Sequence, residues 1–155
     1  MTPPVALSSS PRRTVFLSGM IDGLPLAESS GWRRRAAEVL SEAGFDFYDP
    51  TRVMRAQGSE YRATPNEVFT NDCWHLSRAD VMVVNLDLPA ALETRHAPFF
   101  TIGEMFLAHA AGLPVIVFGQ AFRGRPGYEA IVTRSFDDMA GALRYVIEHY
   151  GAPSQ

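Results

Sequence analysis

The stretch that decides the fold is residues 101–118, which read TIGEMFLAHAAGLPVIVF. An apolar run follows Glu104 and ends at Gly112, a pattern typical of a helix closed by a glycine. Residues 115–118 form a short continuous apolar run, which predicts a buried strand of the parallel-sheet kind. A helix that leads into a buried strand is half of a βαβ unit. The stretch therefore indicates an α/β protein with Glu104 at the start of a helix.

The rest of the chain repeats this alternation. We expect strands at 15–17, 45–48, 81–86 and 115–118 and a weak one at 131–132. We expect helices at 32–43 and 65–78, from residue 104 onward and at 137–150, with residues 51–64 irregular. Strands separated by helices imply right-handed crossovers, so the sheet should be parallel and covered on both faces.

Length and composition fit one globular domain. The chain has 155 residues, 46% hydrophobic and 20% charged, with a net charge of −3, which argues against a nucleic-acid partner. Its single cysteine, Cys73, excludes an internal disulfide and a cysteine zinc site. No apolar run approaches the ~20 residues of a membrane span, so we expect no membrane partner. We expect a flexible lead-in at 1–13, a single domain at 14–150 and a cytoplasmic protein.

Polar residues gather just past the strand ends. They are Ser18, Asp22, Asp49, Asn85, Asp87 and the pair Gly119-Gln120. Each alone is a common turn or cap residue. Because the carboxyl ends of parallel strands lie along one edge, the groups together predict a shared pocket there, beside Glu104.

The chemistry of this pocket is acidic. The chain lacks a dinucleotide or triphosphate glycine loop and a serine-hydrolase elbow, and its histidines lack metal-ligand spacing, so we expect no cofactor or metal. What remains is Glu104, Asp72, Asp87, Asp49 and Asp22. Paired carboxylates suit displacement at an anomeric carbon, one as nucleophile and one as proton donor. In the alternative interpretation, Glu104 only stabilises its helix start and Asp72 caps a helix or pairs with Arg78.

The order of several short motifs resembles the nucleoside 2-deoxyribosyltransferase family, which includes deoxynucleoside 5′-monophosphate N-glycosidases. The motifs are FLSGMID at 16–22, WR at 32–33, YDP at 48–50, ND at 71–72, ADVMVV at 79–84, TIGE at 101–104 and GLPV at 112–115. The resemblance spans roughly residues 14 to 118. It implies a flavodoxin-like, doubly wound α/β fold with about five parallel strands, and a homo-oligomer.

The resemblance also implies roles. Glu104, in the Thr-x-x-Glu pattern that begins at Thr101, would be the nucleophile, and Asp72 would handle the proton of the base. Ser18, Gly19, Met20 and Asp22 would line the base or sugar pocket, with Asp49, Asp87 and Thr101 as further substrate contacts. Met20 stands where many relatives have proline.

One segment departs from the family pattern. Phe99 and Phe100 precede Thr101 where relatives carry a glycine and often a substrate-holding acid, and the loop at 88–100 is longer than usual. Asp87 or Glu93 would replace that acid. We expect the loop, with Arg95 and His96, to form a lid or to pack against a neighbouring subunit.

Three functions follow as hypotheses. The first is a nucleoside deoxyribosyltransferase of base salvage, acting on free nucleosides and bases. The second is a hydrolase of nucleoside 5′-monophosphates, for which Arg33 could reach the phosphate. The third is a catalytically silent nucleotide-binding module, since a fold does not fix a function.

Overall fold

The computed structural model describes residues 11–88 and 98–152 and shows five parallel strands in one sheet, in the order β2-β1-β3-β4-β5. The strands are β1 (Thr14–Gly19), β2 (Asp46–Tyr48), β3 (Val81–Asn85), β4 (Val115–Phe118) and β5 (Arg134–Phe136). The chain order reverses between β1 and β3, where Gly19 pairs with Asn85. This is the switch point at which open α/β sheets form their binding crevice.

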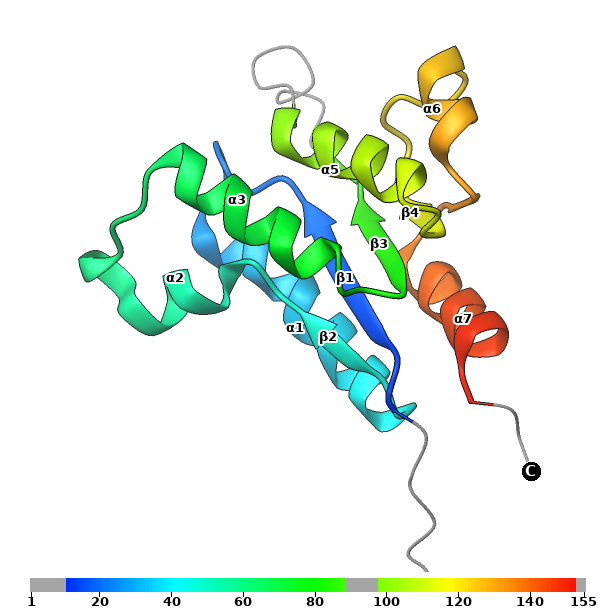
Figure 1. Ribbon diagram of the computed structural model, residues 1–155, viewed down its shortest axis with the longest axis horizontal. Coiled ribbons are helices and arrows are strands. Elements are labelled where there is room, and N and C mark those ends of the chain that lie inside the picture. The colour runs from blue at the N-terminus through cyan, green and yellow to red at the C-terminus, as the bar shows by residue number, and fades with distance from the viewer. Residues whose placement is uncertain (1–10, 89–97, 153–155) are drawn as a thin grey trace, which may run out of the picture.

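Helices cover both faces of this sheet (Figure 1). They are α1 (Leu26–Glu42), α2 (Thr51–Gln57), the short 3₁₀ helix η1 (Gly58–Glu60), α3 (Pro65–Leu76), α5 (Phe99–Ala110), α6 (Pro126–Ile131) and α7 (Met139–Tyr150). Helices α1 and α7 pack on one face, and α3, α5 and α6 lie over the other. The predicted flavodoxin-like α/β fold is confirmed.

The strands alternate their side chains between two buried cores. In β1, Val15 and Leu17 point into the core under α1 and α7, whereas Phe16 points into the core under α5 and α6. Ser18 follows this alternation and is also wholly buried, on the α5 side. A polar side chain at such a position needs a partner, and its partner belongs to the site described below.

Several predicted boundaries are wrong. Helix α1 begins at Leu26, six residues before the expected start; Ser29, Ser30 and Gly31 in its first two turns resemble residues that cap a helix or form a turn. Residues 51–60 are helical rather than irregular. The weak strand expected at 131–132 is instead the end of α6. The fifth strand is Arg134–Phe136, and its exposed Arg134 interrupts the apolar pattern by which a strand is recognised.

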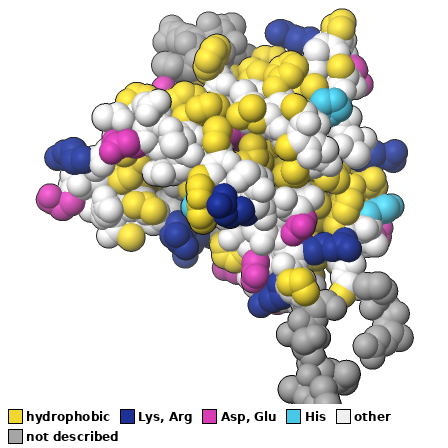
Figure 2. Space-filling model, in the orientation of Figure 1, with side chains coloured by type: hydrophobic (Ala, Val, Ile, Leu, Met, Phe, Trp, Pro, Cys, Tyr) yellow, Lys and Arg dark blue, Asp and Glu magenta, His cyan; other side chains and the backbone are white. Residues whose placement is uncertain are grey.

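Helix α5 begins at Phe99 rather than at Glu104, which corrects the expected helix start. Phe99 and Phe100 therefore form its first turn, and Phe100 packs on Phe69 of α3 with ring centroids 5.2 Å apart. Phe99 is 80% exposed, and Phe106 and Leu107 are exposed further along the helix. Figure 2 shows hydrophobic side chains gathered over this part of the molecule. The homo-oligomer stays a prediction.

The ends of the domain are tied to its body. Of the predicted lead-in at 1–13, residues 1–10 lie outside the described part. Arg12 donates to the Gly44 carbonyl at 3.0 Å and Arg13 to the Tyr150 carbonyl at 2.7 Å. Across residues 11–88 and 98–152, no helix combines the length and the apolar character that a bilayer crossing requires.

One glycine after β4 is held in a conformation that other residues avoid, and this gives a first prediction. Gly119 has φ +103°, and a Cβ there would lie 2.2 Å from the Asp87 backbone nitrogen. Gly119→Ala should therefore displace the chain after β3 and lower the free energy of unfolding by several kcal/mol, because backbone cannot yield as a side chain can.

Gly44→Ala is the matched control for this prediction. Gly44 has φ +86°, and a Cβ added there would meet no other atom within 4 Å, so the variant should lose only about 1 kcal/mol to conformational strain. Urea unfolding of both variants measures the difference. Equal losses would show that the contact with Asp87 does not constrain the loop.

Candidate active site

The candidate site lies at the carboxyl ends of β1 and β3, and its centre is Glu104. Glu104 sits in the second turn of α5, six residues into the helix, and is 4% exposed. It is therefore too far from the first turn to act as the helix-stabilising acid of the alternative interpretation. Thr101 lies one turn earlier on the same side of α5 and is also buried.

Asp72 meets Glu104 from the neighbouring helix α3. A capping box fixes the start of α3: Glu67 N donates to Thr64 Oγ1 at 3.2 Å, and Thr64 N donates to Glu67 Oε2 at 2.6 Å. Asp72 is 5% exposed, and its carboxyl group shares a hydrogen bond with that of Glu104. The structure thus brings the two predicted catalytic acids together, whereas Arg78 bonds to the Trp74 carbonyl instead of Asp72.

A hydroxyl group supports each acid from outside the pair. Ser18 at the end of β1 donates to Glu104 Oε2. Tyr48 at the end of β2 donates to Asp72 Oδ1 at 3.1 Å, and its ring stacks on His75 with centroids 3.7 Å apart. The four side chains form one hydrogen-bonded chain, Tyr48–Asp72–Glu104–Ser18, which holds both carboxyl groups in fixed orientations.

Burial keeps a proton on this pair near neutral pH. Loss of water raises the pKa of Glu104 to about 8, although the Ser18 hydrogen bond acts in the opposite direction. Burial likewise raises the pKa of Asp72 to about 6, against hydrogen bonds from Tyr48 and Glu104. Two acids in contact titrate as one unit. Between these values the pair carries one proton, so it offers one ionised and one protonated carboxyl group.

Asp49 and Arg33 are two further buried charged residues close to the pair. Asp49 Oδ1 accepts from the Thr51 backbone at 2.8 Å and from the Thr51 hydroxyl at 2.6 Å, and Asp49 Oδ2 accepts from Arg55 at 2.7 Å. A direct substrate contact of Asp49 remains a prediction. Arg33 is wholly buried and donates to backbone carbonyls. It therefore does not reach outward to a phosphate, contrary to the expectation from the sequence.

A small cavity opens beside the switch point. Its volume is about 120 Å³, and its walls are Met20, Leu24, Glu28, Trp32, Asn85, Asp87 and Leu88. Gly19 forms part of its surroundings, because a Cβ there would lie 3.1 Å from the Trp32 ring and 3.2 Å from Asn85. Among the predicted contacts, Met20 and Asp87 line this cavity. Asp22 is exposed on the loop that follows β1, outside the lining.

Sequence reasoning missed several groups of the site. Tyr48 ends β2, and Trp32 and Glu28 come from α1, which was expected to begin only at Trp32. Tyr48 had a usable signal, since it directly precedes Asp49 at a strand end. Trp32 stands in the WR motif at 32–33 but was given no role in the site, and Glu28 had no signal beyond its place before the expected helix, because the approach of both to β3 depends on the packing of α1.

Part of the predicted lid, with Glu93, Arg95 and His96, lies outside the described residues. At the two ends of that segment, Leu88 lines the cavity and Phe99 begins α5. The choice between Asp87 and Glu93 as substrate-holding acid therefore stays open, and the lid stays a prediction.

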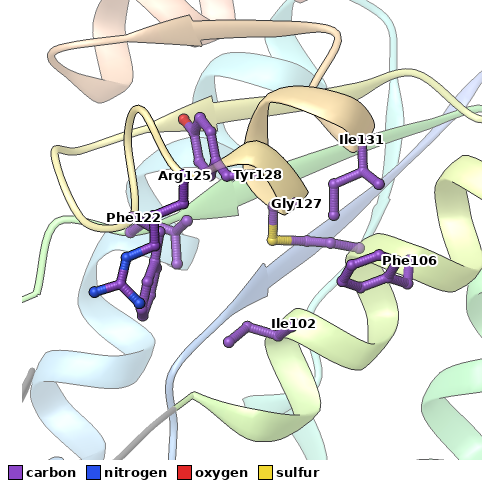
Figure 3. A pocket seen from close by; sticks show the side chains of 9 residues that line it. Ile102, Phe106, Phe122, Arg125, Gly127, Tyr128 and Ile131 are labelled. Carbon is purple, nitrogen blue, oxygen red and sulfur yellow. The ribbon is translucent and has the colours of Figure 1, made fainter.

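A second, larger cavity lies away from the acids. It measures about 290 Å³ and lies between α5 and α6, with Ile102 and Phe106 on one side and Tyr128 and Ile131 on the other (Figure 3). Its walls are almost wholly apolar, and its α5 residues differ from the Thr101–Glu104 side of the helix. In the described ranges, no three His, Cys, Asp or Glu side chains are grouped to hold a metal ion.

The fold is shared with solved deoxyribosyltransferases. A 2-deoxyribosyltransferase from Bacillus psychrosaccharolyticus is 18% identical with a TM-score of 0.60, over 88% of this chain and 91% of that one. A 2-deoxyribosyltransferase from Leishmania mexicana is 13% identical with a TM-score of 0.62, over 89% and 99%. The solution structure of BlsM is 21% identical with a TM-score of 0.61, over 92% and 96%.

No family model and no curated protein matches the sequence. At identities of 13–21% the likeness to the solved structures is one of fold. It confirms the architecture that the resemblance implies, and it leaves the reaction and the residue roles to be tested.

The buried pair predicts a pH-dependent cost in stability. A carboxyl group whose pKa is raised in the folded state contributes stability below its unfolded pKa of about 4.5, and this stability is lost as the pH rises toward about 8. Glu104→Gln removes that loss. The variant should gain on the order of a few kcal/mol over the native chain between pH 5 and pH 8.5.

Urea unfolding at both pH values measures this gain. Glu38→Gln, an exposed change on α1, is the control and should show no such dependence. A Glu104→Gln variant whose advantage is the same at pH 5 and pH 8.5 would mean that Glu104 ionises normally in the folded protein.

Proposed function

We propose that this chain is an enzyme of the nucleoside 2-deoxyribosyltransferase type, which cleaves the N-glycosidic bond of a (deoxy)nucleoside and passes the sugar to another base. One observation carries the proposal: the buried carboxyl groups of Asp72 and Glu104 lie together next to Ser18 at the switch point of the sheet, where burial raises the pKa of both. Glycosyl transfer through a covalent intermediate needs one ionised and one protonated acid. The shared fold with 2-deoxyribosyltransferases supports the same reaction.

In the proposed first step, the proton of the pair moves along the shared hydrogen bond from Glu104, which has the higher pKa, to Asp72, and a carboxylate oxygen of Glu104 then attacks C1′ of the sugar. The C1′–N bond breaks, and its electron pair stays on the departing base, which receives a proton from Asp72. The sugar takes the place of the Asp72 contact at one Glu104 oxygen, while Ser18 continues to hold the other. Tyr48 keeps Asp72 oriented toward the leaving base.

In the proposed second step, a nitrogen of the incoming base attacks C1′. The bond between C1′ and Glu104 breaks, its electron pair returns to the carboxylate, and the proton of the base passes to Asp72. The pair is then back in its starting state with one proton. If water replaces the incoming base, the same steps give hydrolysis.

The small cavity at the switch point favours free nucleosides over 5′-monophosphates. Among the residues that the structure describes there, the charged ones are the acids Glu28 and Asp87. Carboxylates repel a phosphate dianion but accept hydrogen bonds from sugar hydroxyls and base amino groups. We therefore propose uncharged nucleosides and bases as substrates, with a monophosphate hydrolase as the second candidate.

A catalytically silent binding module is disfavoured by the cost of the pair. Two buried acids in contact destabilise a fold, and perturbed carboxyl groups of this kind concentrate at active sites. The test is incubation with a panel of nucleosides and 5′-monophosphates, with and without an acceptor base, followed by chromatography. Base exchange supports the proposal, release of base from monophosphates alone supports the hydrolase, and no turnover supports the module.

We predict that Glu104 is the nucleophile. Glu104→Gln should keep the fold and lower turnover on the order of 10²-fold or more, because the covalent step loses its attacking group. A 2-fluoro sugar substrate, which slows breakdown of the intermediate, should label Glu104 in mass spectrometry. Glu38→Gln should retain native activity, and a label on Asp72 or Asp87 would overturn the assignment.

We predict that Asp72 supplies the proton to the leaving base. The native enzyme should show a bell-shaped pH profile, with limbs near the pKa values of about 6 and about 8 of the pair. Below the first limb no carboxylate is left to attack, and above the second no proton is left to give. Asp72→Asn should lose the alkaline limb and should impair poor leaving bases more than activated ones. Equal damage to both kinds of substrate would make Asp72 a structural residue.

A further inference from the structure

Arg33 is the most deeply buried charge in the described part of the chain. It lies on α1 between Trp32 and the exposed residues Arg34 and Arg35, and its side chain has no exposure to solvent. A buried guanidinium must be paired and hydrogen-bonded, because its desolvation is otherwise very costly. Its partners therefore show what the charge is for.

The guanidinium of Arg33 holds the end of β1 on both sides of Ser18. Its Nε donates to the Leu17 carbonyl at 3.3 Å, and its Nη2 donates to the Gly19 carbonyl at 2.8 Å. A third bond runs from Nη1 to the Ser29 carbonyl on α1. Since Ser18 lies between the two β1 carbonyls, its backbone is fixed by one planar group. The Ser18 hydroxyl, in turn, donates to Glu104.

The charges around Arg33 balance when the acid pair keeps one proton. On its near side, Asp49 Oδ1 lies 3.9 Å from Arg33 Nε, and Arg55 pairs with the other oxygen of Asp49 at 2.7 Å. Toward the site, Ser18 donates to Glu104, and the charges of Glu104 on α5 and Asp72 on α3 act on the same guanidinium. Two arginines, one Asp49 carboxylate and one singly ionised acid pair then sum to zero.

We propose that Arg33 is a positioning residue for the reaction: it holds Ser18 against Glu104 and supplies the buried positive charge that lets the acid pair lose one of its two protons. The inference rests on the proposed function, since it assigns Arg33 a role in that same site. Burial lowers the pKa of Arg33 to about 10, despite the neighbouring carboxylates, so the charge is present throughout the working range of the pair.

Two substitutions separate the two roles. Arg33→Lys keeps the charge, but an ammonium group cannot bond to the Leu17 and Gly19 carbonyls with the planar geometry of a guanidinium. Arg33→Met removes both the bonds and the charge. Arg34→Lys and Arg34→Met, one residue along the same helix, are the matched controls on an exposed arginine.

The first readout is turnover. Arg33→Lys should lower kcat by about 10²-fold with little change in KM, because a misplaced Ser18 affects the reacting carboxylate more than substrate binding. Ser18→Ala should lower kcat as well, and the double variant Arg33→Lys/Ser18→Ala should lose little more than the worse single variant. Fully additive losses, or a native kcat in Arg33→Lys, would overturn the positioning role.

The second readout needs no turnover. Carbon-13 NMR of the Asp and Glu carboxyl groups, assigned with Asp72→Asn and Glu104→Gln, follows the protons of the pair directly. Arg33→Met should move both titration steps to higher pH, whereas Arg33→Lys should leave them near their native positions. If Arg33→Met does not fold, a native titration in Arg33→Lys together with its loss of kcat still supports the proposal.

The two readouts also distinguish this inference from the proposed function. If the chain turns over no nucleoside, the titration still shows whether Arg33 controls the pair, and only the proposed function fails. If Glu104 is labelled by the 2-fluoro substrate but Arg33→Lys behaves like Arg34→Lys in kcat, the enzyme assignment stands and the inference is wrong. An unchanged titration in a folded Arg33→Met variant contradicts the charge role.

Discussion

The contact between the carboxyl groups of Glu104 and Asp72 is the constraint on which the rest of the site depends. Two acids placed side by side away from water cannot both ionise without strong repulsion. The surrounding groups each answer part of this problem. Ser18 donates to Glu104 and Tyr48 donates to Asp72, and the buried Arg33 supplies a positive charge nearby. The buried pair therefore lowers the stability of the fold, a cost that is common at active sites.

The predictable part of the fold is the part with strong hydrophobic periodicity. The strands at 81–85 and 115–118 and the helix at Pro65–Leu76 have continuous apolar runs or a clear N-cap, so local sequence predicts them closely. The early start of α1 and the short helix α2 have neither signal, because their polar residues become helical only through packing on the sheet. The fifth strand could not be predicted for a similar reason: it is short, lies at the sheet edge and is only partly buried.

The candidate site follows the same division. Glu104, Asp72, Ser18 and Met20 could be predicted because strand ends and motif order mark them, and the structure brings the first three into one hydrogen-bonded chain. The position of Glu104 within α5 could not, since Phe99 and Phe100 resemble loop residues that precede a helix. Arg33 resembled its exposed neighbours Arg34 and Arg35. Only the helix rotation set by packing of α1 on β1 determines which of the three arginines is buried.

The sequence separation between Ser18 and Glu104 has a consequence for how the protein folds. The two residues are 86 positions apart and meet only after α5 has docked on β1. Such long-range closure is slow, because loop entropy is lost before native contacts compensate for it. A nascent chain that has emerged only as far as β3 contains Ser18, Tyr48 and Asp72 but not Glu104. The acid pair therefore forms only after α5 has been synthesised, and no chain that ends before Glu104 contains a complete site.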